Sequence, residues 1–254
     1  MIQETTPRKR YRLISCEIFY REICSLIANS PVRCDVEFLP KGLHDLGVEK
    51  MRPRIQERID AVTPDMADHI LMGYGLCNNG IVGLTAGQIP LVVPRAHDCI
   101  TLFLGDRARY RTCFEAHPGT YYLTSGWLER NDSESAGDET VSQKLGLFLQ
   151  YEELVQKYGE DNARYIMETM GDAVAHYDRV AYINMGLACE TCFRDEARAI
   201  AAKRGWSFDE LAGSMDLLRK LVYGDWDSSF LIVPPGGRIA AAYDDGVIRV
   251  DGPK

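Results

Sequence analysis

The sequence has 254 residues, a formal net charge of −8 at neutral pH, and 46% hydrophobic residues. This composition is typical of a folded globular protein with one large domain or two smaller lobes. An acidic chain of this kind lacks the concentrated basic face that binds the phosphate backbone, so we expect no nucleic-acid partner.

The same sequence gives expectations about compartment. No run of about 18 apolar residues occurs, so we expect no membrane-spanning helix. The first residues lack the apolar core of a signal peptide, which predicts a cytoplasmic protein. Thiols stay reduced in that compartment, so the eight cysteines are not expected to form a disulfide framework.

The first half of the chain alternates between apolar strands and amphipathic helices. Helices are predicted after residue 18, within residues 40–60 and from residue 100 onward. Strands are predicted at residues 11–15, 36–39, 69–73, 91–94 and 120–124. Such alternation indicates an α/β protein with a parallel sheet covered on both faces, which is a three-layer αβα architecture.

The second half repeats this order after a polar segment at residues 130–140. Helices are predicted at 143–158, 160–173, 190–204 and 210–223, strands at 180–184 and 229–233, and a short extended piece at 206–208. The repetition predicts two related Rossmann-like lobes. Residues 1–130 would form the N-terminal lobe that carries the Cys and His motifs, and residues 131–254 a helical connection and the second lobe. A ligand cleft would then lie between the lobes at the strand carboxyl ends.

Three cysteines share one position relative to the predicted strands. Cys16 follows the first strand, Cys77 the third and Cys99 the fourth. Because the carboxyl ends of parallel strands meet at one edge of a sheet, these thiols are expected to converge there. Each also lies near a predicted helix N-terminus, where the helix dipole favours the thiolate form that binds metals.

Other donors are expected at the same edge. His97 precedes Cys99 by two residues, Asp98 could orient an imidazole or act in catalysis, and His44 follows the second strand. Glu17 could act as an acid or base, or cap the first helix. The donor set predicts a zinc site with an open position or, as an alternative, an iron–sulfur cluster. The competing interpretation is that each cysteine is a small buried apolar residue.

Two further motifs leave alternatives open. The glycine-rich turn with Gly75, Asn78 and Gly80 is neither a dinucleotide-binding motif nor a P-loop, and we expect it to let the backbone approach a ligand or cofactor. Cys189 and Cys192 form a CxxC motif at a predicted helix N-terminus. This pair could be a redox dithiol, could supply ligands from across the cleft, or could be coincidental.

Three motifs together resemble the DUF1638 family. They are Gly75-Leu76-Cys77-Asn78-Asn79-Gly80, Pro94-Arg95-Ala96-His97-Asp98-Cys99-Ile100 and Pro118-Gly119-Thr120-Tyr121-Tyr122-Leu123-Thr124-Ser125-Gly126-Trp127. The resemblance extends over residues 11–237. The family also tends to have Cys and His at the positions of Cys16 and His44, whereas the CxxC pair is not a feature that we associate with it.

The resemblance implies a setting in anaerobic organisms, often beside genes for corrinoid-dependent methyl transfer. In such systems, zinc held by Cys and His activates a thiol as methyl acceptor. The resemblance therefore implies an enzyme of one-carbon metabolism, a methyltransferase type that acts on a small-molecule substrate with a corrinoid protein or a methyltransferase as partner. The alternatives are a non-enzymatic carrier of a metal, cluster or corrinoid, and an iron–sulfur enzyme or electron carrier.

Overall fold

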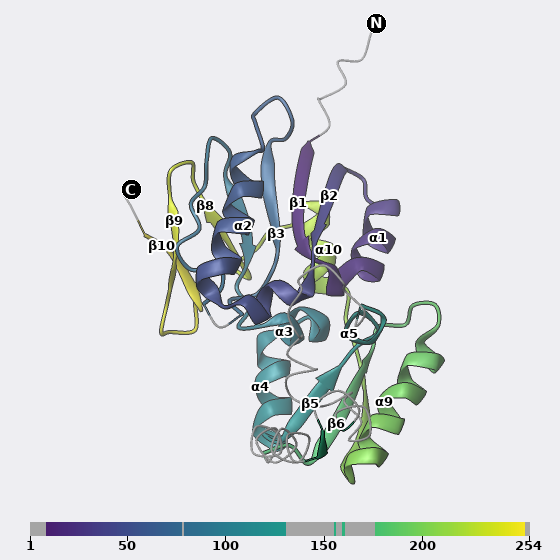
Figure 1. Cartoon of the computed structure of the whole chain (residues 1–254). Coiled ribbons are helices and arrows are strands. Elements are labelled where there is room, and N and C mark those ends of the chain that lie inside the picture. Colours follow the sequence, from purple (N-terminus) through teal and green to yellow (C-terminus); the bar gives the residue numbers. More distant parts are fainter. Residues whose placement is uncertain (1–8, 78, 131–154, 156–158, 161–175, 252–254) are drawn as a thin grey trace, which may run out of the picture.

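The computed structural model describes residues 9–77, 79–130, 155, 159–160 and 176–251. Its first sheet has the strand order β2-β1-β3-β4-β8 (Figure 1). Strands β1 to β4 are parallel, and β8 pairs with β4 in the antiparallel direction. The strands are β1 (Arg10–Cys16), β2 (Arg33–Leu39), β3 (His69–Gly73), β4 (Leu91–Pro94) and β8 (Phe230–Val233).

Helices cover both faces of this sheet, which explains why the central strands are continuous apolar runs. Helix α1 packs against α10, and α2 lies in front of the sheet while α10 lies behind it (Figure 1). Helix α2 buries Met51, Ile55 and Ile59, which are four residues apart and so share one helix face. The connecting helices are η1 (Glu17–Phe19), α1 (Tyr20–Ala28), η2 (Lys41–Leu46), α2 (Val48–Asp60), α3 (Cys99–Leu104) and α10 (Asp216–Tyr223).

A second, smaller sheet has the order β5-β6-β7, with all strands parallel. Its strands are β5 (Thr120–Leu123), β6 (Arg179–Asn184) and β7 (Ser207–Ala212), and its neighbouring helices are α4 (Arg107–Ala116), α5 (Ser125–Glu129) and α9 (Glu190–Arg204). A hairpin of β9 (Arg238–Ala241) and β10 (Ile248–Asp251) lies beside β8. None of the helices in the described part of the chain is long and apolar enough to cross a membrane.

The α/β class and the mostly parallel main sheet are confirmed, but the chain is divided between the sheets differently from the expectation. Strand β5 precedes residue 130 yet belongs to the second sheet, and β8 follows it yet completes the first. Residues 207–212 form strand β7, whereas a helix was predicted from residue 210. The predicted helices at 143–158 and 160–173 lie almost entirely outside the described residues.

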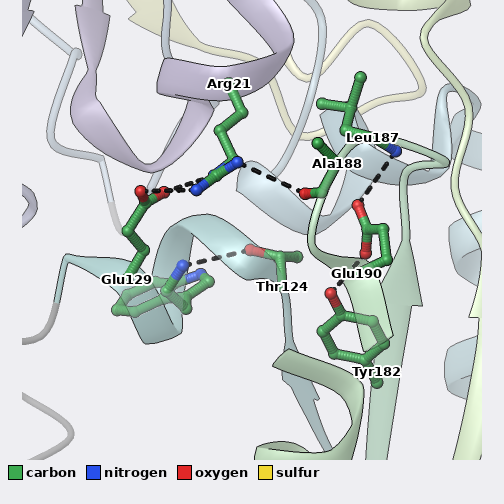
Figure 2. Close-up of polar contacts among 8 residues, drawn as sticks. Arg21, Thr124, Glu129, Tyr182, Leu187, Ala188 and Glu190 are labelled. Atoms are coloured by element: carbon green, nitrogen blue, oxygen red, sulfur yellow. Dashed lines mark hydrogen bonds and ion pairs between the residues drawn. The ribbon is translucent and has the colours of Figure 1, made fainter. Parts of the chain in front are cut away.

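A polar junction joins α1 of the first sheet to the elements of the second (Figure 2). Arg21 donates two hydrogen bonds to the Glu129 carboxylate, at 2.7 and 2.9 Å, and a third to the carbonyl of Ala188 at 3.4 Å. On the second sheet, the Tyr182 hydroxyl donates to Glu190 at 2.5 Å. Paired donors of this geometry fix the relative position of the elements that carry them.

Glu22 lies in the same junction and differs from its neighbours. It is fully buried, and within the described structure neither of its carboxylate oxygens has a hydrogen-bond partner. Burial, with a smaller contribution from Glu190, raises its pKa from 4.5 to about 7, although its own backbone amide and Arg21 act in the opposite direction. Folding therefore disfavours the charged form of Glu22.

Candidate functional site

The strand register aligns the carboxyl ends of the first sheet. Cys16, the last residue of β1, pairs with Leu39 at the end of β2, and Ser15 pairs with Gly73 at the end of β3. Strand β4 continues the parallel arrangement beside β3. The turns that follow these four strands therefore begin at one edge of the sheet, which is where ligands bind in open α/β sheets.

Three thiols come together at this edge. Cys16 is buried, while Cys77 and Cys99 are partly exposed. Burial is the main cause that raises the pKa of each thiol, and the thiols also act on one another: Cys99 raises the pKa of Cys16, Cys16 that of Cys77, and Cys77 that of Cys99. Because such electrostatic interactions fall off with distance, the mutual effects show that the three sulfur atoms share one region.

The turn that carries Cys77 packs closely on the turn that carries Cys99. The Cys77 amide donates to the carbonyl of His97 at 2.9 Å. A side chain at Gly75 would put its Cβ 2.8 Å from the backbone of Asp98, so this glycine permits the close approach of the two turns. Cys77 itself has a left-handed backbone, with a φ of 46°, which non-glycine residues rarely adopt outside functional sites.

The other members of the predicted cofactor loop are placed differently. Gly80 packs against α2, where a Cβ would lie 2.8 Å from the Met51 sulfur. Asn78 lies outside the described residues. Both Gly75 and Gly80 thus have packing roles in this structure, and their prediction as cofactor-binding residues stays a prediction.

His44 and Tyr74 extend the thiol cluster toward η2. Their rings lie 6.4 Å apart, and burial lowers the pKa of His44 to about 4, which keeps the imidazole neutral. Burial raises the pKa of Tyr74, and Cys16 and Cys77 raise it further, so the phenol is close to both thiols. The buried Tyr74 hydroxyl has no hydrogen-bond partner among the described residues. Tyr74 therefore offers the site an unsatisfied polar group.

Lys41 is a member of the site that the sequence did not reveal. It is only 2% exposed, and its ammonium donates to the carbonyl of Trp127 at 2.8 Å. The ammonium lowers the pKa of Cys16, and a hydrogen bond from the Trp127 side chain lowers that of Cys99. The Lys41 amide donates to the carboxylate of Glu17 at 2.9 Å, so Glu17 ties the end of β1 to the end of β2.

Asp98 lies close enough to Cys77 and Cys99 to raise the pKa of both thiols, whereas His97 is exposed. The His97 side chain is exposed and, with Asp98, lines an open cavity of about 950 Å³. Asp98 caps α3, where it accepts hydrogen bonds from the Thr101 amide at 3.1 Å and the Thr101 hydroxyl at 3.2 Å. The structure thus gives Asp98 a structural role as a helix cap.

The CxxC pair belongs to the second sheet. Cys189 is the N-cap of α9 and Cys192 lies one turn later, and both are exposed. Arg21 interacts electrostatically with Cys189, which places the pair beside the polar junction.

A metal ion needs several donor side chains around one point at the thiol edge, the edge of the first sheet that carries Cys16, Cys77 and Cys99. Among the residues that the structure describes, no group of three or more His, Cys, Asp or Glu side chains is arranged to hold a metal ion. The chemistry of the donors nevertheless fits a soft ion, because three thiols and a neutral imidazole are ligands that zinc and iron–sulfur clusters prefer. Side-chain adjustment at the partly exposed Cys77 and Cys99 would be required for joint coordination.

Comparison with known proteins gave one match. A family model described as "Protein of unknown function (DUF1638)" matches residues 38–222. No curated protein and no solved structure gave a match.

Proposed function

Because the chain belongs to the DUF1638 family, whose function is unknown, we propose a function from the site itself: the protein binds a soft metal ion through Cys16, Cys77 and Cys99, and zinc is the favoured ion. The observation that carries the proposal is that thiols from three separate turns are close enough to raise one another's pKa. The thiols repel one another when they ionise, and a bound cation removes that repulsion.

The neighbouring side chains support this proposal. His44 is a neutral imidazole close to Tyr74, and it suits the role of a further ligand better than the exposed His97 does. Burial keeps Cys16 and Cys99 in the thiol form, contrary to the expectation of thiolates, and the Lys41 ammonium near Cys16 and the Trp127 side chain near Cys99 offset only part of that effect. The Tyr74 hydroxyl can donate a hydrogen bond to a substrate atom at the site.

The reaction that we propose is methyl transfer between a small-molecule thiol, or a similar Lewis base, and a corrinoid protein. The resemblance of the Cys and His motifs to a family associated with such systems favours this reaction. A bound metal would lower the pKa of the substrate thiol and hold it as a thiolate. Partial exposure of Cys77 and Cys99 supports access for a small substrate, whereas Cys16 is buried.

Metal analysis of protein purified without oxygen tests this proposal. We expect about one metal ion per chain, and we expect Cys77→Ser and Cys99→Ser to lose most of it because each removes a thiolate ligand. Cys192→Ser, which changes an exposed thiol on the second sheet, is the matched control and should retain the metal.

The absorption spectrum of the same sample separates the metal alternatives. Zinc thiolates do not absorb in the visible range, whereas an iron–sulfur cluster gives a brown protein. The proposal fails if the protein carries no stoichiometric metal, or if the Cys77 and Cys99 variants retain as much as the control.

A further inference from the structure

The cavity of about 950 Å³ beside the thiol edge has a lining of its own. Most of its lining comes from the turn after β4, from α4 with the residues just before it, and from the loop between β9 and β10, and Leu217 of α10 and Ser229 complete it. The volume is in the range of small-molecule sites. Its lining contains three arginines, Arg95, Arg107 and Arg111, and two exposed aromatic side chains, Phe114 and Tyr243.

The arginines give the cavity a cationic side. The Arg95 guanidinium donates to the carbonyls of Gly246 and Ile248, and that of Arg107 donates to the carbonyl of Asp245. These acceptors are neutral carbonyl groups, so the hydrogen bonds to them do not neutralise the guanidinium charges, although the carboxylate of Asp244 lies near Arg95. Burial lowers the pKa of Arg95, and the neighbouring Arg107 lowers it further, so the two cations lie close together.

Each acidic side chain of the lining already has a partner within the protein, and Asp244 lies close enough to Arg95 to raise its pKa. Asp98 and Asp106 accept hydrogen bonds from backbone amides as the N-caps of α3 and α4. Asp244 accepts from the amide of Gly246, and Asp245 forms an ion pair with Arg111 at 3.2 Å. Arg95 and Arg107 are therefore the side chains with donors to offer an anion, and a guanidinium binds carboxylate or phosphate in two-point geometry.

The aromatic side chains give the cavity an apolar rim. Phe114 is 49% exposed and Tyr243 is fully exposed, and they are two of the large apolar side chains that the described structure leaves most accessible. Exposed aromatic rings around a concave surface are typical of sites that stack a flat group of a ligand. A ligand with both an anion and a ring would satisfy both sides of the cavity.

We infer that this cavity binds an organic anion that carries both a planar ring and a carboxylate or phosphate group, with Arg95 and Arg107 on the anion and Tyr243 and Phe114 on the ring. Tyr110, which also lines the cavity, hydrogen-bonds to Asp98, the residue that precedes Cys99. The bound molecule would therefore lie next to the thiol cluster. The inference goes beyond the proposed metal site, and its test requires no metal.

Calorimetric titration of the full-length protein with four probes tests this inference. AMP and benzoate combine a ring with an anion, adenosine has the ring alone, and inorganic phosphate has the anion alone. We expect AMP or benzoate to bind at least about tenfold more tightly than adenosine or phosphate, because only they engage both sides.

Variants assign the two halves of the ligand. Arg107→Gln should weaken binding of the preferred probe by about tenfold or more, while Arg107→Lys, which keeps the charge, should recover part of it. Tyr243→Ser should weaken the ring-bearing probe and leave phosphate unchanged. Arg33→Gln, on the exposed surface of β2, is the control. The inference is overturned if neither ring-bearing anion binds, if adenosine binds as tightly as AMP, or if Arg107→Gln behaves like the control.

Discussion

Replacement of the buried acid Glu22 by glutamine should make the protein more stable at alkaline pH. Glu22 is fully buried at the junction of α1 with the second sheet, and its carboxylate oxygens have no partner within the described residues. Glutamine has nearly the same shape and carries no charge. The substitution therefore removes the cost of burying an unpaired carboxylate while it preserves the packing.

The magnitude follows from the pKa of Glu22, which burial raises from 4.5 to about 7 in the folded protein. Between these two values the folded protein keeps a proton that the unfolded chain releases, so the free energy of unfolding falls as the pH rises. At about 1.4 kcal/mol per pH unit, the interval corresponds to about 3.5 kcal/mol. This contribution is fully present below pH 4.5 and is lost above about pH 7.

Urea unfolding at several values between about pH 5 and about pH 8.5 measures the effect. The wild-type protein should lose stability across this window, whereas Glu22→Gln should show a flatter profile and exceed the wild type by up to about 3.5 kcal/mol above neutral pH. Glu115→Gln, at an exposed position on α4, is the control for removal of one negative charge. Parallel profiles for the wild type and Glu22→Gln would refute the reasoning.

Three further predictions concern local structure. Iodoacetamide should modify the exposed Cys189 and Cys192 first and the buried Cys16 last, as followed by peptide mass spectrometry, and early labelling of Cys16 would contradict the structure. Asp98→Ala should lower the free energy of unfolding by about 1 kcal/mol through loss of the α3 cap, while Asp98→Asn should keep the cap and the stability. An equal loss of stability in both variants in urea unfolding would argue against a capping role. Gly126→Ala should destabilise the fold by about 1–3 kcal/mol because the added Cβ would collide with the backbone of η1. An unchanged melting temperature would contradict this close contact.

The main sheet was predictable because its central strands are unbroken apolar runs. Strands β3 and β4 begin and end at the predicted residues, 69–73 and 91–94. Only the start of strand β7 was predicted, as an extended piece at 206–208, because its residues are exposed or half-buried and show no apolar alternation. The direction of β8 was also unpredictable, since an apolar run has the same pattern in a parallel and in an antiparallel strand.

The candidate site could be predicted in part from the strands that precede its residues. The convergence of Cys16, Cys77 and Cys99 follows from topology, because each thiol comes after a strand of one parallel sheet. Lys41 could not be predicted, since its burial depends on Trp127, which lies 86 residues further along the chain. His97 was expected among the ligands, but a spacing of two residues from Cys99 does not determine where an exposed side chain points.

The antiparallel pairing of β8 with β4 makes the N-terminal sheet depend on the end of the chain. A fragment that stopped at residue 130 would keep β1 to β4 but would leave the buried edge of β4 open to solvent and remove α10 from one face. Open apolar edges pair with other chains, so such a fragment would aggregate instead of folding alone. Synthesis of the chain must therefore be nearly complete before the thiol edge can acquire its final form.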